Sequence, residues 1–257
     1  MKMIPLRQSV VYGPINSRRF GKSLGINLLP SDCKFCTFSC VYCQHADTPG
    51  KAPKFPTFDE VTKEADEVFQ KADKDRAKID WIMLSGNGEP TLHTNFADLV
   101  ESIISLRNLY LPRIPIGILS NSSTCYKDDI RYVLSLLDGR FMKLDAGSLY
   151  TFHDVNRPST MFAWGDVIQG LCDLPSVTIQ SMFVTGKVDN TNEKCVNDWI
   201  EAVQCIKPVE VQIYTVERNP QEDGILPVEE EKLHFISNKL KEKTNIPSNI
   251  YYEGDDL

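Results

Sequence analysis

Short apolar runs rich in β-branched residues alternate along this chain with stretches of helical hydrophobic period. Six runs are expected to form strands, at residues 23–29, 80–85, 116–120, 141–146, 177–184 and 209–216. Each run is almost continuously apolar, which is typical of a parallel sheet covered by helices, whereas a half-exposed antiparallel strand would alternate polar and apolar residues. The pattern therefore predicts an α/β fold built on a parallel sheet.

Six helices are predicted between and after these strands. The clearest start is Thr57-Phe58-Asp59-Glu60, where Thr and Glu three residues apart form a capping box. The helices are expected near residues 58–72, 95–107, 125–137, 163–172, 192–206 and 228–243. Right-handed crossovers would curl these units into a parallel (β/α)6 partial TIM barrel, with functional residues beyond the C-terminal strand ends. A doubly wound open sheet has the same alternation and stays open as the alternative.

The chain of 257 residues shows no internal repeat and no low-complexity tract, so we expect a single domain over 1–257. Its core is predicted at about 20–220, followed by a C-terminal helix and tail at about 226–257. The Pro-rich segment 49–56 is expected to be an exposed connection. No apolar signal region opens the chain and no apolar run approaches the ~20 residues of a membrane span, so we expect a cytoplasmic protein without a membrane partner.

Charge is distributed unevenly along the chain. The formal net charge of −7 argues against a generally basic nucleic-acid-binding surface. Residues 1–54 nevertheless contain eight Lys and Arg against two Asp, a net charge of +6, which leaves −13 for the remainder. This basic segment, which includes Arg18 and Arg19, is therefore a candidate contact for an anionic partner.

Four of the eight cysteines lie within eleven residues, in the segment Cys33-Lys-Phe-Cys36-Thr-Phe-Ser-Cys40-Val-Tyr-Cys43 that follows the first predicted strand. Cytosolic thiols stay reduced, so this cluster is expected to bind metal or to act in catalysis. A zinc site usually places about a dozen or more residues between its two Cys pairs, and here only three intervene. Short spacings are typical of iron-sulfur ligation, which favours a cubane held by Cys36, Cys40 and Cys43 with one iron open.

These motifs resemble the radical S-adenosylmethionine (SAM) enzymes. The Cys36-x3-Cys40-x2-Cys43 spacing with Tyr42 before the last cysteine is similar to their signature, and Ser85-Gly-Asn-Gly-Glu-Pro-Thr-Leu-His93 is similar to their glycine-rich Glu-Pro motif. Leu119-Ser-Asn-Ser-Ser123 resembles their third-strand Asn motif, with Ser122 where glycine is common. Over about residues 10–245, four further segments resemble the small wyosine-synthase-like iron-sulfur oxidoreductase branch: Tyr12-Gly-Pro14, Ser17-Arg-Arg19, Lys143-Leu-Asp-Ala146 and Asn156-Arg-Pro158.

The resemblance implies two cofactors, a 4Fe-4S cluster and SAM. In this family the open iron chelates the methionine part of SAM, the reduced cluster donates an electron, and a 5′-deoxyadenosyl radical takes hydrogen from the substrate. It also implies an electron donor such as flavodoxin or ferredoxin. Cys33 departs from the pattern and is interpreted, in this order, as a bystander thiol, an alternative ligand or a hydrogen donor to a substrate radical.

SAM-binding positions are expected at the ends of successive strands. Gly86 and Gly88 would let backbone approach the ligand closely, or they form a tight turn. Lys143 and Asp145 share one strand face and would hold cofactor or substrate, or pair with each other. The full set of expected SAM contacts is Tyr42, Gly86, Asn87, Gly88, Glu89, Ser120, Asn121, Lys143, Asp145, Gln180, Tyr214 and Thr215.

Asn156 and Arg157 are weaker candidates for substrate binding, because a guanidinium can clamp a carboxylate or phosphate. No catalytic residue can be assigned, and the substrate is open among small molecules, RNA and protein. A glycyl-radical activase of a partner protein and a non-catalytic iron-sulfur or zinc scaffold stay as alternatives. The basic N-terminal segment would suit either RNA or an acidic electron donor.

Overall fold

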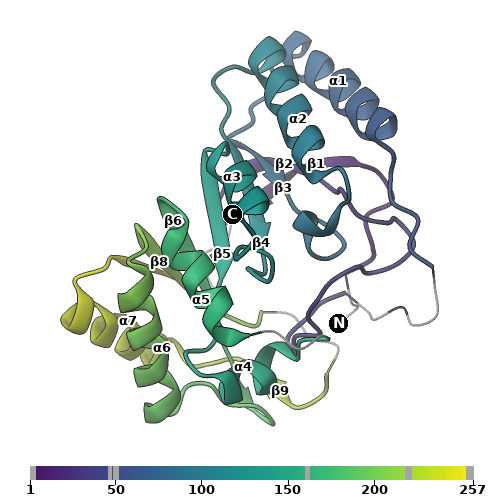
Figure 1. Ribbon diagram of the computed structural model, residues 1–257. Helices are drawn as coiled ribbons and strands as arrows, with labels where there is room; N and C mark the ends of the chain where they lie inside the picture. Colours follow the sequence, from purple (N-terminus) through teal and green to yellow (C-terminus); the bar gives the residue numbers. More distant parts are fainter. Residues whose placement is uncertain (1–3, 46–47, 49–51, 160–162, 218–221, 253–257) are drawn as a thin grey trace.

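The structure is a computed structural model that describes residues 4–45, 48, 52–159, 163–217 and 222–252 (Figure 1). Its centre is an eight-stranded sheet in the order β1-β2-β3-β4-β5-β6-β8-β10. Every neighbouring pair from β2 to β10 is parallel, and β1 pairs antiparallel with β2. The strands are β1 Val11–Ser17, β2 Gly21–Ile26, β3 Trp81–Leu84, β4 Ile116–Ser120, β5 Gly139–Lys143, β6 Val177–Phe183, β8 Glu210–Thr215 and β10 Ser248–Tyr251.

The sheet follows the order of the chain, so it lacks the reversal of strand order that defines a doubly wound sheet. The predicted α/β partial barrel is therefore confirmed, and the open-sheet alternative is wrong. All six predicted strands are present, within a few residues of their expected bounds.

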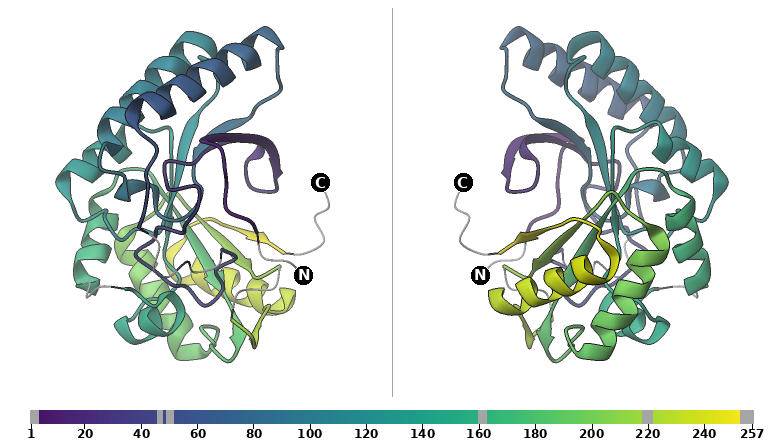
Figure 2. Two further views of the ribbon diagram at one scale, coloured as in Figure 1. Left: turned by 90° about the vertical axis from the view of Figure 1, so that its right-hand side faces the viewer. Right: turned by 90° about the vertical axis from the view of Figure 1, so that its left-hand side faces the viewer.

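Helices cover the convex side of the curved sheet (Figure 2). The capping box of α1 is present: Glu60 N donates to Thr57 Oγ1 at 3.2 Å, and Thr57 N donates to the Glu60 carboxylate at 2.7 Å. No helix in the described ranges is long and apolar enough to cross a membrane. The helices are α1 Phe58–Lys74, the 3-10 turn Pro90–Leu92, α2 Phe96–Tyr110, α3 Asp128–Ser135, α4 Leu149–Asn156, α5 Trp164–Asp173, α6 Glu193–Ile206 and α7 Glu230–Thr244.

Two edge strands, β1 and β10, were not predicted from the sequence. Both leave most of their residues partly or fully exposed, so neither has the continuous apolar run of a buried parallel strand. A small antiparallel pair, β7 Thr185–Gly186 with β9 Ile225–Leu226, was also not predicted. Of the expected Pro-rich connection, residues 52–54 are exposed and 49–51 lie outside the described residues, as do residues 253–257 of the expected tail.

The two faces of the sheet differ because successive side chains point to opposite sides of a strand. In β5, Met142 belongs to the main core between sheet and helices, whereas Lys143 points the other way. The same alternation places Ile179 in the core and Gln180 on the concave face. The concave face near the strand ends therefore carries polar side chains, and a cavity of about 760 Å³ opens there.

Candidate active site

A cavity of about 760 Å³ lies on the concave face of the sheet. Its walls come from the β1–β2 hairpin, the cysteine loop and the inward side chains of β4, β5, β6, β8 and β10. The expected site residues that line it are Cys40, Tyr42, Cys43, Gly88, Glu89, Ser120, Asn121, Lys143, Asn156, Gln180, Tyr214 and Thr215. Five expected residues do not line it: Cys36, Gly86, Asn87, Asp145 and Arg157.

The loop after β3 holds one side of the cysteine loop by backbone hydrogen bonds. Phe35 N donates to the Asn87 carbonyl at 2.9 Å, and Glu89 N donates to the Phe35 carbonyl at 3.0 Å. Gly88 has φ +145°, and a Cβ added there would lie 1.9 Å from the Phe35 carbonyl oxygen. Only glycine can therefore occupy this position, and the glycine-rich loop supports the cysteine loop directly.

The end of helix α4 holds the other side of the cysteine loop. Val41 N donates to the Val155 carbonyl at 2.9 Å, and Ser39 N donates to the Arg157 carbonyl at 3.1 Å. The loop is therefore fixed between two elements that are far apart in the sequence.

The three expected cluster ligands have different surroundings. Asn121 Nδ2 lies 3.4 Å from Cys36 Sγ, and Asn156 Nδ2 lies 3.4 Å from Cys40 Sγ, so each amide donates to a sulfur. Burial raises the pKa of Cys36 to about 12, and the neighbouring Cys40 adds to the effect. Burial likewise raises the pKa of Cys40 to about 11, with Asp145 adding to the effect. Cys43 lines the cavity, and its thiol donates to the His45 carbonyl at 3.5 Å.

These surroundings suit iron-sulfur ligation. N–H donors aimed at the sulfurs stabilise thiolates, and a partly buried loop limits solvent access to a cluster. The described parts of the chain contain no group of three or more His, Cys, Asp and Glu side chains arranged to hold a single metal ion. A cubane takes each thiolate on a separate iron, and one loop that carries three free thiols fits this requirement.

Glu89 is a fully buried carboxylate whose two oxygens accept hydrogen bonds from neighbouring strand ends. Its Oε1 accepts from Thr91 N at 3.1 Å, from Thr91 Oγ1 at 2.7 Å and from Ser120 Oγ at 3.0 Å. Its Oε2 accepts from Asn121 N. Burial raises the pKa of Glu89 while these donors oppose the change. Glu89 thus connects the end of β3 to the end of β4 and orients the Asn121 amide that reaches Cys36.

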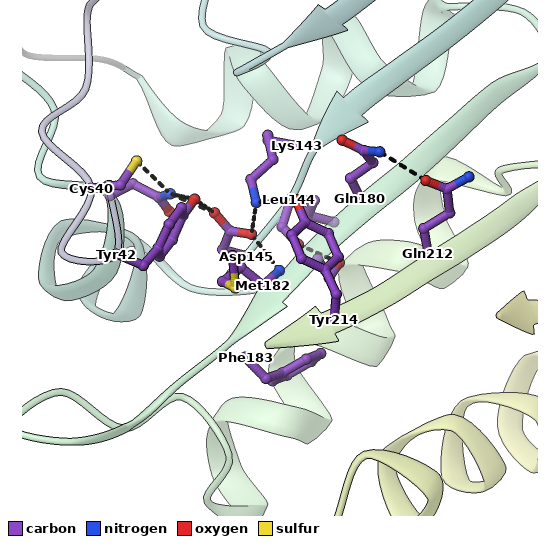
Figure 3. Close-up of polar contacts among 12 residues, drawn as sticks. Cys40, Tyr42, Lys143, Leu144, Asp145, Gln180, Met182, Phe183, Gln212 and Tyr214 are labelled. Carbon is purple, nitrogen blue, oxygen red and sulfur yellow. Dashed lines mark hydrogen bonds and ion pairs between the residues drawn. The ribbon is translucent and has the colours of Figure 1, made fainter. Parts of the chain in front are cut away.

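Asp145 is the centre of a buried polar cluster on β5, β6 and the cysteine loop (Figure 3). One carboxylate oxygen accepts from Lys143 Nζ at 2.9 Å and from Met182 N at 2.7 Å. The other accepts from the Tyr42 hydroxyl and from Asn156 Nδ2, the latter at 2.7 Å. Asp145 therefore connects the strand end to the cysteine loop rather than facing the cavity itself.

Lys143 completes this cluster on the cavity side. Its Nζ donates to the Tyr214 hydroxyl at 2.8 Å and lies 4.7 Å from the ring centroids of both Tyr42 and Tyr214. Burial lowers the pKa of Lys143, but Asp145 and Tyr214 together raise it above its usual value, so the amine is charged. Burial, followed by Asp145, raises the pKa of Tyr42, so its phenol stays neutral and donates to the carboxylate.

The remaining expected residues have structural partners. Gln180 Nε2 donates to Gln212 Oε1 at 2.8 Å, and Thr215 Oγ1 donates to the Phe183 carbonyl at 2.8 Å. The Asn87 side chain binds backbone groups of Arg7 and Pro30. A Cβ on Gly86 would lie 2.1 Å from Asn27 Oδ1, so this glycine permits close packing away from the cavity.

Arg157 leaves the site altogether. It ends α4 in the left-handed region, with φ 44°, and its guanidinium pairs with Glu222. Asn156, one residue before it, points inward to Cys40 and Asp145. The two neighbouring residues were expected to act together on substrate, and the structure separates them.

The sequence did not place the β1–β2 hairpin or the last strand at the site. Asn16 and Arg19 from the hairpin and Tyr251 from β10 line the cavity. Their edge strands lack the apolar pattern of a buried strand, although the hairpin contains the Ser17-Arg-Arg19 motif.

A cysteine loop after the first parallel strand, a glycine-rich loop packed on it, and a cavity on the concave face of a partial barrel define a radical SAM protein. The sequence profile described as the radical SAM superfamily matches residues 31–198, so the chain belongs to this superfamily. Within it the chain belongs with the UPF0026 proteins. It is 31% identical to one from Synechocystis sp. over 208 residues, covering 79% of this chain and 74% of the relative.

A second UPF0026 protein and two solved structures are also similar to this chain. A UPF0026 protein of Methanocaldococcus jannaschii is 29% identical over 259 residues, covering 97% of this chain and 77% of the relative. The solved structure of TYW1 with a lysine-pyruvate adduct bound has a TM-score of 0.62 at 14% identity, covering 86% of this chain and 74% of that one. A radical SAM methyltransferase from Sphaerobacter thermophilus has a TM-score of 0.67 at 11% identity, covering 90% and 66%. At these identities the solved structures share the fold.

Proposed function

We propose that this radical SAM enzyme cleaves SAM reductively at a 4Fe-4S cluster and abstracts hydrogen from a substrate held in the 760 Å³ cavity. When bound, the cluster would supply the electron and SAM the 5′-deoxyadenosyl radical. The observation that carries the proposal is the common cavity of Cys40, Cys43 and the polar strand ends. Two of the three expected cluster ligands and most of the expected SAM contacts line this one cavity, which supports the proposal.

Cys36, Cys40 and Cys43 are proposed as the three cluster ligands. Asn121 and Asn156 would stabilise the first two as thiolates through their N–H···S hydrogen bonds. Because burial raises the pKa of the thiols of Cys36 and Cys40, binding the cluster must release their protons.

The proposed SAM contacts fall into two groups. Residues of the first group line the cavity, and we propose that they contact the ligand through side chain or backbone: Tyr42, Gly88, Glu89, Ser120, Asn121, Lys143, Gln180, Tyr214 and Thr215. Gly86, Asn87 and Asp145 form the second group, which we propose to act by holding the first in position. Asp145 does so by fixing Tyr42 and Lys143.

The reaction needs a reductant, for which we propose flavodoxin or ferredoxin, and the whole described chain is proposed to act as one radical SAM domain in the cytoplasm. Asn156 is proposed as a residue that positions Cys40 instead of one that binds substrate. Arg157, which pairs with Glu222, keeps no proposed substrate role.

The test is 5′-deoxyadenosine formation by protein that has been reconstituted anaerobically, reduced with dithionite and incubated with SAM. Cys36→Ala, Cys40→Ala and Cys43→Ala are expected to lose the product. Cys205→Ala, which removes an exposed thiol on α6, is the matched control and should retain it.

Metal analysis accompanies this assay. About four irons and four sulfides per chain would support the cubane. One zinc without sulfide, together with no 5′-deoxyadenosine, would overturn the proposal in favour of a scaffold.

A further inference from the structure

Arg19 occupies the turn between β1 and β2, and its side chain forms part of the cavity wall. The guanidinium carbon lies 4.7 Å from the ring centroid of Tyr214 and 5.5 Å from that of Phe20. Stacking on Tyr214 holds the planar group in one orientation.

Among the described residues, one nitrogen of this guanidinium has no hydrogen-bond partner. Arg19 Nη1 is buried and makes no hydrogen bond, and no ion pair among the described residues includes Arg19. Buried N–H groups in native proteins nearly always have an acceptor, and a guanidinium cannot lose its proton to escape this requirement. An acceptor supplied by a ligand would satisfy it.

The other charged groups of the cavity wall already have an ion-pair partner or hydrogen-bond donors within the protein. Arg18 pairs with Glu217, and Lys143 pairs with Asp145 at 2.9 Å. Both carboxylate oxygens of Glu89 accept hydrogen bonds, from Thr91, Ser120 and Asn121. Among the described residues, Arg19 is therefore a charged group of the wall whose side chain keeps an unsatisfied donor.

Two side chains, Tyr214 and Lys143, lie between Arg19 and Tyr42 of the cysteine loop. Asn156 joins Cys40 to Asp145, Asp145 joins Lys143, Lys143 reaches the Tyr214 hydroxyl, and Arg19 lies beyond over the Tyr214 ring. The rings that Arg19 contacts are those of Phe20 and Tyr214, and neither belongs to the cysteine loop, where the methionine part of SAM is expected.

We propose that Arg19 binds an oxyanion, a carboxylate or phosphate, of a small-molecule substrate. This inference rests on the proposed function and names its substrate class. The planar fork suits a bidentate oxyanion. The cavity of about 760 Å³ lies in the upper part of the range of roughly 300–1,000 Å³ for ligand sites, which leaves room beside SAM. The net charge of −7 disfavours a long polyanion such as RNA.

The first test is calorimetric titration of the cluster-loaded, SAM-saturated protein with inorganic phosphate and with acetate at constant ionic strength. Arg19→Gln is expected to lower the affinity for the preferred anion at least tenfold, which corresponds to about 1.4 kcal/mol of binding free energy. Arg19→Lys keeps the charge but loses the fork and should be intermediate. Arg113→Gln, an exposed arginine before β4, removes the same charge and should bind as wild type. Equal binding by wild type and Arg19→Gln, or no binding by wild type, overturns the proposal.

The carboxylate of SAM is a second possible source of the oxyanion. Equilibrium dialysis of radiolabelled SAM against Arg19→Gln separates the two sources. Unchanged SAM affinity is expected, whereas a tenfold loss of SAM affinity would assign Arg19 to SAM and overturn the substrate role. Of the two probes, the one that binds more tightly identifies the substrate group as phosphate or carboxylate.

A measurement on wild-type protein covers the case in which the variants misfold. Phenylglyoxal modifies arginine side chains, and mass spectrometry follows the rate at each site. The preferred anion should slow modification of Arg19 several-fold and leave Arg113 unaffected. Equal rates at Arg19 with and without the anion would contradict the proposal.

These readouts do not depend on turnover. Anion binding through Arg19 in a protein that makes no 5′-deoxyadenosine would count against the proposed function alone. Product formation by a protein that binds neither anion would count against the Arg19 site alone.

Discussion

The side-chain amide of Asn156 donates to the sulfur of Cys40 at 3.4 Å and reaches Asp145 with the same nitrogen at 2.7 Å. Asn156 closes helix α4, whereas Cys40 lies 116 residues earlier in the cysteine loop. The helix therefore contributes a donor to an expected cluster ligand as well as backbone support for its loop.

Removing that donor should lower the reduction potential of the cluster, because N–H···S bonds stabilise the more negative, reduced form. Asn156→Ala is expected to lower it by on the order of 50 mV, since a one-electron couple moves ~59 mV for each ~1.4 kcal/mol and a hydrogen bond to a charged group is worth about that. A redox titration followed by electron paramagnetic resonance measures the change. Asn238→Ala on the exposed side of α7 is the control, and an equal potential in both variants would refute the role of Asn156.

Gly88→Ala should destabilise the fold and prevent cluster loading. The added Cβ would meet the Phe35 carbonyl at 1.9 Å, and φ of +145° is strained for any other residue. Strain and overpacking each cost about 1–3 kcal/mol. Urea unfolding and iron content provide the measurements. Gly165→Ala on α5, where nothing lies within 4 Å of the new Cβ, is the matched control and should be neutral or slightly stabilising. Normal iron loading by Gly88→Ala would contradict this account.

Glu89→Gln should cost about 1–3 kcal/mol of unfolding free energy, because the new amide turns an acceptor into a donor among groups that also donate. The Asn121 backbone N–H and the Ser120 hydroxyl would lose a carboxylate partner. Urea unfolding measures the loss, and Glu101→Gln on the exposed face of α2 gives the reference. Equal stability of the two variants would show that Glu89 does not support the strand ends.

The ion pairs of Glu222 predict a dependence of stability on acid pH. Hydrogen bonds from Arg157 and Lys187 lower the pKa of Glu222. A carboxylate with a lowered folded pKa stabilises the fold above its unfolded pKa of about 4.3, and loses that effect as pH falls through the folded value. Near pH 7, the free energy of unfolding of wild type should therefore exceed that of Glu222→Gln by at most about 1 kcal/mol, because the ion-pair partners are partly exposed.

This difference should shrink to zero as the pH falls below about 4. Urea unfolding of wild type and Glu222→Gln across pH 3–7 checks it. Asp223→Asn, which removes an exposed neighbouring carboxylate, is the reference variant in the same series. A difference that stays constant with pH would mean that the ion pairs do not carry the effect.

Buried parallel strands and capped helices could be predicted from the sequence because their patterns are local. The run at 177–184 became β6, whose residues are all buried, and the capping box at Thr57 formed as expected. The edge strand β1 was not predicted, since its exposed face and its Gly13-Pro14 pair break the apolar pattern.

The cavity position of Cys40 and Cys43 could be predicted for the same reason, as their spacing is a local pattern. The direction of a side chain at a helix end is not local. Arg157 turns outward because the chain enters the left-handed region at that residue, and Asn87 is drawn to the backbone of Pro30 by packing that no motif encodes. The site residues from β1 and β10 are brought to the cavity by tertiary closure, which local sequence patterns do not encode.

That closure also bears on how the chain folds. From β2 onward each strand of the main sheet lies beside the preceding one, so the sheet can assemble from successive local units. Arg18 then joins the hairpin to the far edge, donating to the Tyr252 carbonyl across 234 residues. Contacts of such sequence separation carry the largest loop-closure entropy until the intervening sheet has formed. We expect the cavity wall that holds Arg19 to be completed last during folding and to open first in hydrogen exchange.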